Sequence, residues 1–580
     1  MLLIVHNVTS ATRLLDVVGL FRDDLRVQLL ATCPGTSPFR SGTSELLAAL
    51  GVPVVPWDQA LDIGAELAIS ASFGGQLQAF KGQLAVLSHG VGYNKRLAAP
   101  DTGHRTPDTG HRAPSALGAG GSGSDPVFGL SPEWALADDG APVADAMVLS
   151  HPVQLDRLRA SCPEAAGTAV LGGDPCFDRI LAARPRREAF RRALGVRPGQ
   201  RLVLLNSTWN PTSLFGDGGA HDAPGGRDAR DARDARDATE GGPSDVLPLL
   251  LSRLPELPVD EYRIAAVLHP NVWHGHGPGQ IRLWLDGAAR AGLTLVDPVA
   301  DWRQALIAAD AVLGDFGSVS YYAAAIGTPV LVAAPGLTVL EQSSQVAEFV
   351  REAPRLDPYA PLRPQLDAVL ADGRVPTGPA TLTTSCPGES ADRLRALFYR
   401  LIGIPEPAAP ALLDPLPLPA HQPALVTAPL RVLTEVVDGT VTLRRFAAVR
   451  YEPDGPGDGH LAVHEDTLDP GALDLADLIL QHTPPDRPDD PRLGPPRQWA
   501  AEVLGRHRSC ALAALVTGPD ACTVVERTGR AWELTALGLD PAAAASALLA
   551  WRAAHSGREP AELTVRSGGA VHRVAVTPSR

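Results

Sequence analysis

Apolar runs of strand length alternate with amphipathic, helix-like stretches from the start of the chain to about residue 400. Apolar strands separated by helices are typical of a parallel sheet that is covered by helices on both faces. A first series of runs lies at 2–5, 27–31, 52–55, 67–70, 84–88 and 146–150, and a second at 168–171, 202–206, 263–269, 294–296, 311–314 and 330–333. Helices are expected at 43–50, 186–194, 280–291 and 302–308. The pattern predicts an α/β fold with two tandem Rossmann-like domains facing each other across a cleft.

The chain of 580 residues is too long for one hydrophobic core. We assign residues 1–165 to an N-terminal Rossmann-like domain and 166–403 to a second one. A Pro-rich linker follows at 404–428, and 429–580 is expected to form a small accessory α+β domain without a recognisable site. Within that domain, Asp438-Gly439 between alternating runs predicts a tight hairpin turn, and 541–554 predicts a helix.

Two low-complexity segments interrupt the alternation. The first, at about 100–125, contains the heptad DTGHRTP repeated once as DTGHRAP, and the second, at about 216–243, contains four copies of Arg-Asp-Ala. Neither can bury apolar surface, so we interpret both as disordered loop insertions. His104 and His111 only copy the heptad spacing and have no acidic or thiol partner that would complete a metal site.

Charge and composition restrict the class of protein. A net charge of −14 argues against a nucleic-acid partner, because gripping phosphate backbones requires a basic surface. The apolar run 1–5 lacks a charged flank and is too short for a signal peptide, and no run approaches the length of a membrane span. The six cysteines are scattered and form no CxxC pair, which is typical of a reduced, cytoplasmic protein.

The segment 313–325 has the pattern of a strand, a turn and a helix. The strand stops at Asp315, turns through Gly317 and Ser318, and a short helix follows. Free backbone N–H groups at the positive end of a helix dipole can bind a phosphate. Gly317 lets a ligand approach the backbone, and Ser318 and Ser320 supply hydroxyls. The alternative is that Ser318 only caps a crossover helix.

Two histidines follow directly after apolar runs. His89 precedes a loop with Gly90 and Lys95, and an imidazole placed there can take a proton from an acceptor hydroxyl near neutral pH. His269 precedes Pro270, which fixes the turn, and can neutralise a phosphate or protonate a leaving oxygen. For both residues, a hydrogen-bonded structural histidine is the competing interpretation.

Two further strand ends carry polar residues. After 168–171, the turn 172–177 can place Asp178 at the cleft between the domains, although an ordinary strand-to-helix connection also explains it. After 202–206, Ser207 and Thr208 offer hydroxyls to a phosphate or a nucleotide sugar.

The order of these motifs resembles the CDP-glycerol:poly(glycerophosphate) glycerophosphotransferase family, and more broadly GT-B-fold transferases and UDP-N-acetylglucosamine 2-epimerases. The matching elements, between about residues 80 and 335, are His89-Gly90, the Gly-x-Pro-x-x-Asp turn at 173–178, His269-Pro270 and the Asp-x-x-Ser turn at 315–318. The family's Thr-Pro-Leu-Lys after His-Gly is replaced by 91–95, with the lysine one residue later, and its Tyr-Ser-Ser is replaced by 316–318. These departures leave the acceptor and the type of transfer open.

The resemblance implies a GT-B-like arrangement, with an acceptor domain first and a nucleotide-donor domain second. It implies that His89 is the base that activates an acceptor hydroxyl, that His269 and Ser318 hold the donor pyrophosphate, and that Asp315 positions the loop or a donor hydroxyl. Residues expected to line the donor site are Gly90, Lys95, Asp178, Ser207, Thr208, Asp315, Gly317, Ser318 and Ser320.

We therefore predict a transferase that moves glycerophosphate or a sugar from a nucleotide-diphosphate donor to a hydroxyl acceptor, with no cofactor or metal ion. Charge stabilisation by His269, Ser318, Ser320 and the helix N-terminus needs no metal. A non-hydrolysing UDP-sugar 2-epimerase is the first alternative, with Glu133, Asp138 and Asp139 as candidate carboxylates. The second alternative is an inert scaffold of the same fold that binds a protein partner through its C-terminal domain.

Overall fold

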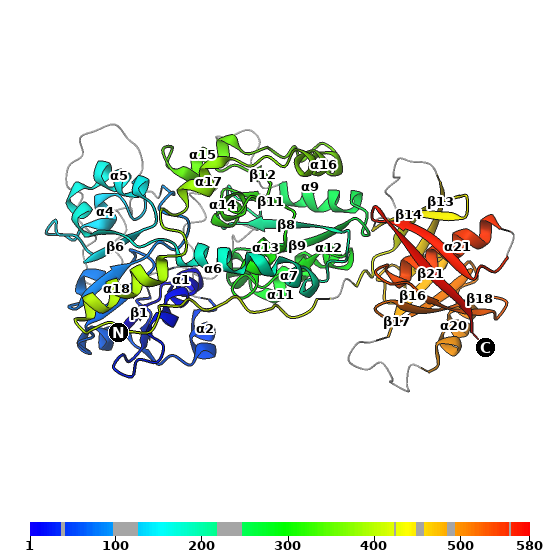
Figure 1. Cartoon of the computed structure of the whole chain (residues 1–580), viewed down its shortest axis with the longest axis horizontal. Coiled ribbons are helices and arrows are strands. Elements are labelled where there is room, and N and C mark those ends of the chain that lie inside the picture. The colour runs from blue at the N-terminus through cyan, green and yellow to red at the C-terminus, as the bar shows by residue number, and fades with distance from the viewer. Residues whose placement is uncertain are drawn as a thin grey trace, which may run out of the picture.

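The computed structural model describes residues 1–35, 37, 41–96, 126–216, 246–422, 425–447, 457–483, 494–555 and 558–579. Two α/β units and a barrel follow one another along the long axis of the molecule (Figure 1). The predicted insertion at about 100–125 lies outside the described residues, and so does the one at about 216–243 apart from Gly216.

The first unit is built on a seven-stranded parallel sheet in the order β3-β2-β1-β4-β5-β6-β7. This is the Rossmann order, which reverses direction between β1 and β4. Its strands are β1 (Leu2–Ile4), β2 (Leu30–Thr32), β3 (Val54–Val55), β4 (Leu67–Ser70), β5 (Gln83–Val86), β6 (Ala146–Leu149) and β7 (Ala169–Leu171). Its helices include α1 (Val8–Val18), α2 (Thr43–Leu50), α3 (Trp57–Asp62), α4 (Pro132–Ala135) and α5 (Pro152–Ser161).

The second unit repeats this arrangement with a five-stranded parallel sheet in the order β10-β9-β8-β11-β12. Its strands are β8 (Arg201–Ser207), β9 (Tyr262–Leu268), β10 (Thr294–Leu295), β11 (Ala311–Asp315) and β12 (Val330–Ala334). Its helices include α6 (Pro175–Ala183), α7 (Arg187–Ala193), α9 (Val246–Arg253), α10 (Pro270–His276), α11 (Pro278–Trp284), α12 (Asp286–Arg290), α13 (Trp302–Ala308), α14 (Ser318–Ala325), α15 (Gln345–Glu352), α16 (Leu362–Asp372) and α17 (Thr377–Leu382). The predicted α/β fold with two Rossmann-like sheets is confirmed.

Two elements assigned to the second unit belong to the first. The run 168–171 forms β7, which pairs with β6 at the edge of the first sheet. The helix α18 (Ser390–Ile402) returns to the first unit, where Leu394, Leu397 and Phe398 pack into its core (Figure 1). The alternation of strands and helices is the same in both units, so it gave no indication of which sheet either segment joins.

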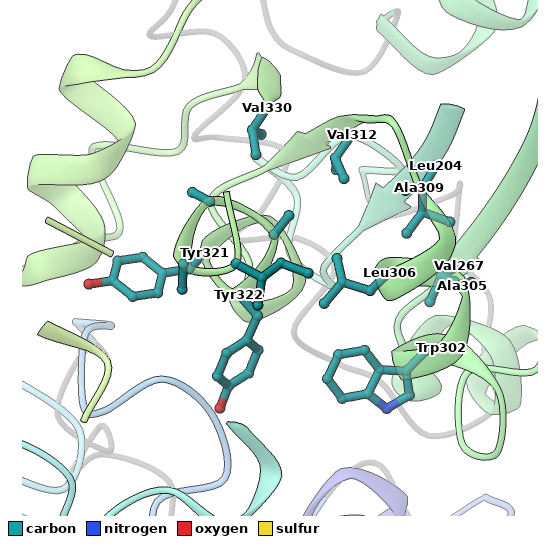
Figure 2. Close-up of a cluster of buried hydrophobic side chains, with 14 of the residues drawn as sticks. Leu204, Val267, Trp302, Ala305, Leu306, Ala309, Val312, Tyr321, Tyr322 and Val330 are labelled. Carbon is teal, nitrogen blue, oxygen red and sulfur yellow. The ribbon is translucent and has the colours of Figure 1, made fainter. Parts of the chain in front are cut away.

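A buried cluster orients α14 in the second unit. Trp302 and Leu306 of α13 pack with Tyr322 of α14 beneath β8 and β11 (Figure 2). The rings of Trp302 and Tyr322 lie 6.2 Å apart. This packing fixes the direction in which the N-terminus of α14 points.

A buried ion cluster joins the two α/β units. Asp16 of α1 accepts hydrogen bonds from Arg303 of α13 through both carboxylate oxygens, at 2.9 and 2.8 Å. Arg179 of α6 also donates to Asp16. Because buried charges are stable only when they are paired, this cluster holds the two units in one relative orientation.

The C-terminal unit is a closed β-barrel, and the prediction of a small α+β domain was wrong in this respect. The strands β13 (Leu430–Val437), β14 (Thr440–Phe446), β15 (Asp458–His464), β16 (Leu478–His482), β17 (Leu512–Gly518), β18 (Ala521–Glu526), β19 (Ala531–Thr535), β20 (Glu562–Ser567) and β21 (Ala570–Pro578) close in the order β13-β14-β20-β21-β19-β18-β17-β16-β15. The helices α19 (Pro470–Leu475) and α20 (Pro496–Arg506) connect β15, β16 and β17, which are parallel.

The helix α21 (Pro541–Ala554) explains how the barrel is filled. It contacts strands from all around the barrel, and residues 542–548 are buried with the inward-facing strand residues. Alanine side chains are small enough for a helix to fit there. Sequence periodicity predicted this helix with its observed limits, but not the closure of strands around it.

Two local results complete the fold. The turn at Asp438 and Gly439 has positive φ at both residues, 49° and 77°, as a tight primed hairpin turn requires. In the described part of the chain, no helix has the length and apolar character needed to cross a membrane.

Candidate functional site

Histidines from both α/β units meet where the two sheets present the carboxyl ends of their strands. His89 follows β5 of the first sheet, and His269 follows β9 of the second. Both His89 and Lys95 lower the pKa of His269 electrostatically, so these three side chains share one site. The structure therefore brings the two imidazoles together at one end of the two sheets.

His269 is held as a hydrogen-bond donor. It caps α10, and its Nδ1 accepts a hydrogen bond from the backbone N–H of Asn271 at 3.1 Å. The neutral ring therefore carries its proton on Nε2. Burial and the nearby Lys95 lower the pKa of His269 well below its usual value, so the ring is neutral near pH 7. Nε2–H can donate a hydrogen bond to a ligand oxygen.

His89 is exposed, although protein groups replace much of the water around its ring. That desolvation, together with the charges of Lys95 and Arg13, lowers the pKa of His89 to about 4. Its ring lies edge-on to Phe128, with the centroids 6.0 Å apart. The imidazole is therefore unprotonated near neutral pH and accessible, as a proton acceptor must be.

Lys95 is placed against the second unit by backbone pairing. Residue 95 forms an antiparallel bridge with Leu340, and Arg96 N–H donates to the carbonyl of Val339 at 2.9 Å. Its Nζ lies 5.4 Å from the ring centroid of Trp209 and 5.5 Å from that of Phe316. Desolvation lowers the pKa of Lys95 to about 8, and Asp315 opposes that shift. A partly desolvated ammonium beside two imidazoles attracts an anion.

The N-terminus of α14 faces the His89 loop. Within the described ranges, no side chain caps this helix at Gly317, so the N–H groups of its first turn remain available to an anion. Ser318 Oγ accepts a hydrogen bond from the backbone N–H of Val91 at 3.2 Å. A Cβ at Gly90 would lie 2.6 Å from Ser318 Oγ, so a larger residue at position 90 would displace the Ser318 hydroxyl from its present position. Gly317, Ser318 and Gly90 therefore lie together at this end of the second sheet, and Lys95 lies beside them against Phe316.

Asp315 and three predicted hydroxyl residues have an internal role in this structure. Asp315 is fully buried and accepts hydrogen bonds from the backbone N–H groups of Thr208 at 2.7 Å and Gly317 at 2.9 Å. Ser207 and Thr208 are buried in the same loop. Ser320 is fully buried, and its Oγ accepts a hydrogen bond from Asn206 Nδ2 at 2.7 Å. These residues shape the turn, and the side chains of Asp315, Ser207 and Ser320 have hydrogen-bond partners within the protein.

Asp178 holds a helix end. Its carboxylate accepts hydrogen bonds from the backbone N–H groups of Gly388, at 2.7 Å, and Ser390, at 3.0 Å. Ser390 Oγ also donates to it. The residue therefore fixes the start of α18, which agrees with the ordinary strand-to-helix connection considered for this segment.

Two residues near His89 escaped the sequence analysis. His6 follows β1, and its Nε2 donates to the carbonyl of Gly74 at 2.6 Å. Arg13 of α1 donates through Nε to the carbonyl of His89 at 3.2 Å. Both lower the pKa of His89 through their charge. The sequence pattern could have indicated His6, because it follows an apolar strand as His89 and His269 do. Nothing in the sequence indicated Arg13.

The carboxylates considered for epimerase chemistry lie elsewhere. Glu133 of α4, and Asp138 and Asp139 after it, are exposed. The described residues contain no cluster of three or more His, Cys, Asp or Glu side chains arranged to hold a metal ion. The charged groups that shift the pKa values of the two histidines are basic, namely Lys95, Arg13 and His6, and Asp315 beside Lys95 accepts hydrogen bonds from backbone N–H groups.

The chain is similar to several solved structures. The wall teichoic acid polymerase TagF is 12% identical, with a TM-score of 0.43, over 70% of this chain and 89% of that chain. A putative UDP-N-acetylglucosamine 2-epimerase from Listeria monocytogenes is 12% identical, with a TM-score of 0.36, over 71% and 99%. The UDP-GlcNAc 2-epimerase from Neisseria meningitidis bound to UDP-GlcNAc is 10% identical, with a TM-score of 0.35, over 69% and 98%. Both kinds of protein are among those that the sequence motifs resemble.

No protein-family model matches the chain, and no curated protein does.

Proposed function

We propose that the protein is a GT-B-like transferase that moves a group from a nucleotide-diphosphate donor to an acceptor hydroxyl. The observation that carries the proposal is the meeting of His89, from the first unit, with His269 and the uncapped α14 N-terminus of the second. A proton acceptor on one side of the site and anion-binding groups on the other are what such a transfer requires.

The donor pyrophosphate binds to the second unit. The first-turn N–H groups of α14, the Nε2–H of His269 and the ammonium of Lys95 all present positive charge to it. The rings of Trp209 and Phe316 beside Lys95 exclude water and strengthen this attraction.

His89 removes the proton of the acceptor hydroxyl. With a pKa of about 4 in the free protein the imidazole is a weak base, because Lys95 and Arg13 disfavour its protonated form. A bound pyrophosphate offsets those charges and raises the basicity of His89 when the donor is in place. Proton transfer is therefore favoured only in the complex with the donor.

The bond that breaks depends on the donor. With a nucleotide sugar, the acceptor oxygen attacks the anomeric carbon, the bond to the β-phosphate oxygen breaks, and the nucleoside diphosphate leaves. With CDP-glycerol, the oxygen attacks the glycerol-bearing phosphorus, the phosphoanhydride bond breaks, and CMP leaves. In both cases the proton of the hydroxyl goes to His89, and the leaving phosphate accepts hydrogen bonds from His269 and α14.

The test is a panel of CDP- and UDP-linked donors added to the purified protein, read by thermal stabilisation and by release of nucleotide. We expect at least one donor to stabilise the protein, with His269→Ala losing the stabilisation. His89→Ala should keep donor binding and lose turnover, because His89 acts on the acceptor. Stabilisation by no nucleotide would support an inert scaffold, and conversion of a UDP-sugar without an acceptor would support an epimerase.

A further inference from the structure

A second candidate site lies between the second α/β unit and the barrel. A cavity of about 40 Å³ is lined by Arg197 and Gln200 before β8, by Arg263 on β9, and by Arg445 and Asp540 of the barrel. It has room for about three water molecules. Because Arg263 is near the amino end of β9 and His269 follows its carboxyl end, the cavity lies at the opposite edge of the sheet from the proposed active site.

The acidic groups at this interface are already paired. Arg445 donates to Asp260 of the second unit at 2.7 Å and to Asp540 of α21's N-terminal cap at 2.7 Å. Arg197 pairs with the same Asp540 at 2.8 Å. These contacts dock the barrel on the α/β unit and leave none of the described carboxylates at this interface free for a third guanidinium.

Arg263 is that third guanidinium. Only 5% of its surface is exposed, and none of the carboxylates in the described ranges pairs with it. Its terminal nitrogens donate to the carbonyls of Gly292 at 3.0 Å and Gln422 at 3.4 Å, and its buried Nε has no hydrogen-bond partner among the residues that the structure describes. Burial and the neighbouring Arg197 lower the pKa of Arg263 to about 10. A buried cation without a counter-ion is costly, and an anion in the cavity would remove that cost.

We propose that this cavity binds a small oxyanion, a phosphate or a carboxylate group, on Arg263 and Arg197. Three guanidinium groups lie at this interface, those of Arg197, Arg263 and Arg445. The carboxylates paired there are those of Asp260 and Asp540, so the described side chains leave one positive charge in excess. The planar guanidinium matches the geometry of two oxyanion oxygens. Arg197, whose side chain is 32% exposed, lies on the side that solvent reaches and provides the route of entry.

The bound oxyanion contacts both units. Arg197 and Arg263 belong to the second α/β unit, and Arg445 and Asp540 belong to the barrel. Its binding therefore stabilises the docked position of the barrel. The site is independent of the proposed transferase activity, because it uses none of the residues assigned to that activity.

Isothermal titration of the full chain with sodium phosphate and, separately, sodium acetate tests the proposal, with sodium chloride at equal ionic strength as the reference. We expect a saturable site for at least one oxyanion and a higher Tm in its presence. Binding to phosphate alone would indicate a phosphate group as the natural ligand, and binding to both would indicate the shared oxyanion chemistry.

Variants separate this cavity from the proposed active site, where phosphate also has donors. Arg263→Gln and Arg197→Gln should each weaken oxyanion binding at least tenfold, whereas Ser318→Ala should leave this site unchanged. Arg374→Gln is the matched control, since the side chain of Arg374 is 86% exposed. The proposal is overturned if neither oxyanion binds, if chloride produces the same response, or if both cavity variants bind as the wild type does. Arg197 is partly exposed, so its variant remains informative if Arg263→Gln fails to fold.

Discussion

Lys95 should titrate far below an ordinary lysine, and the chain is suited to measuring this because it has only two lysines, Lys81 and Lys95. Lys81 is exposed, whereas Lys95 is half-buried between Trp209 and Phe316. Desolvation in that position lowers the pKa of Lys95 from 10.5 to about 8. Acylation of amines by a small reagent at several pH values, with quantification by peptide mass spectrometry, reports the titration of each lysine separately.

The expected effect is large. At pH 8, about half of Lys95 is the free amine, compared with roughly 0.3% of a lysine of ordinary pKa, which is a ratio of more than about 100. Accessibility changes the absolute rate of acylation, so the pH at which the rate is half-maximal is the quantity to compare. An anionic nucleotide should raise the pKa of Lys95 by about one unit or more and slow its acylation at pH 8. Lys81 is the internal reference.

The desolvation argument is refuted if the acylation rates of Lys95 and Lys81 are half-maximal at the same pH. A Phe316→Ala variant gives a further check, because admitting water beside Nζ should raise the midpoint toward the ordinary value. A low midpoint that no nucleotide changes would keep the desolvation argument and contradict the assignment of Lys95 to the donor site.

Three further changes have defined outcomes. Gly90→Ala should place a methyl group against Ser318 Oγ and reduce nucleotide-induced thermal stabilisation, whereas Gly167→Ala, which has nothing within 4 Å, should not. Asp16→Asn should lower the free energy of unfolding, measured by urea denaturation, by about 3 to 5 kcal/mol, because Arg303 and Arg179 lose their shared counter-ion. A decrease of less than about 1 kcal/mol would contradict the role of the ion cluster. Burial and His482 lower the pKa of His464 to about 4. His464 therefore binds a proton more readily in the unfolded state than in the folded state. As the pH is lowered from about 7 to 4.5, the free energy of unfolding should fall by about 2 kcal/mol, as followed by the fluorescence of buried Trp532. His464→Leu should reduce that pH dependence, and an unchanged slope would show that His464 does not cause it.

Much of the fold was predictable because its signals are local. Apolar runs and helical periodicity predicted β4, α2, α13 and α21 with their observed limits, and the other strands of the two parallel sheets to within a few residues. Both Rossmann-like sheets follow from that alternation. The strands β15, β16 and β19 and the helices α19 and α20 were missed, since the C-terminal region lacks a regular alternation. Closure of a barrel depends on which strands pair, and pairing between strands that are far apart in the sequence cannot be predicted from the residue pattern of a short segment.

For the candidate site, the sequence determined which residues follow strands and therefore lie at the ligand-binding edge of a parallel sheet. His89, His269 and the turn at Ser318 were found in this way. Only the tertiary structure decided which polar groups remain available. Asp315 ends a strand, and Ser320 and Asp178 lie in the helices that follow strands, yet the polar atoms of all three side chains bind the protein's own backbone and side chains.

The same distinction applies to charge. The sequence determines a net charge of −14, but the folded chain gathers Lys95, Arg13 and two histidines in one place and buries Arg263 in another, where no described carboxylate pairs with it. Whether a side chain is desolvated and what lies beside it depends on contacts between residues tens to hundreds of positions apart. Those contacts determine proton affinity and ligand charge, so composition alone could argue against a nucleic-acid partner but could not indicate either of the proposed anion sites.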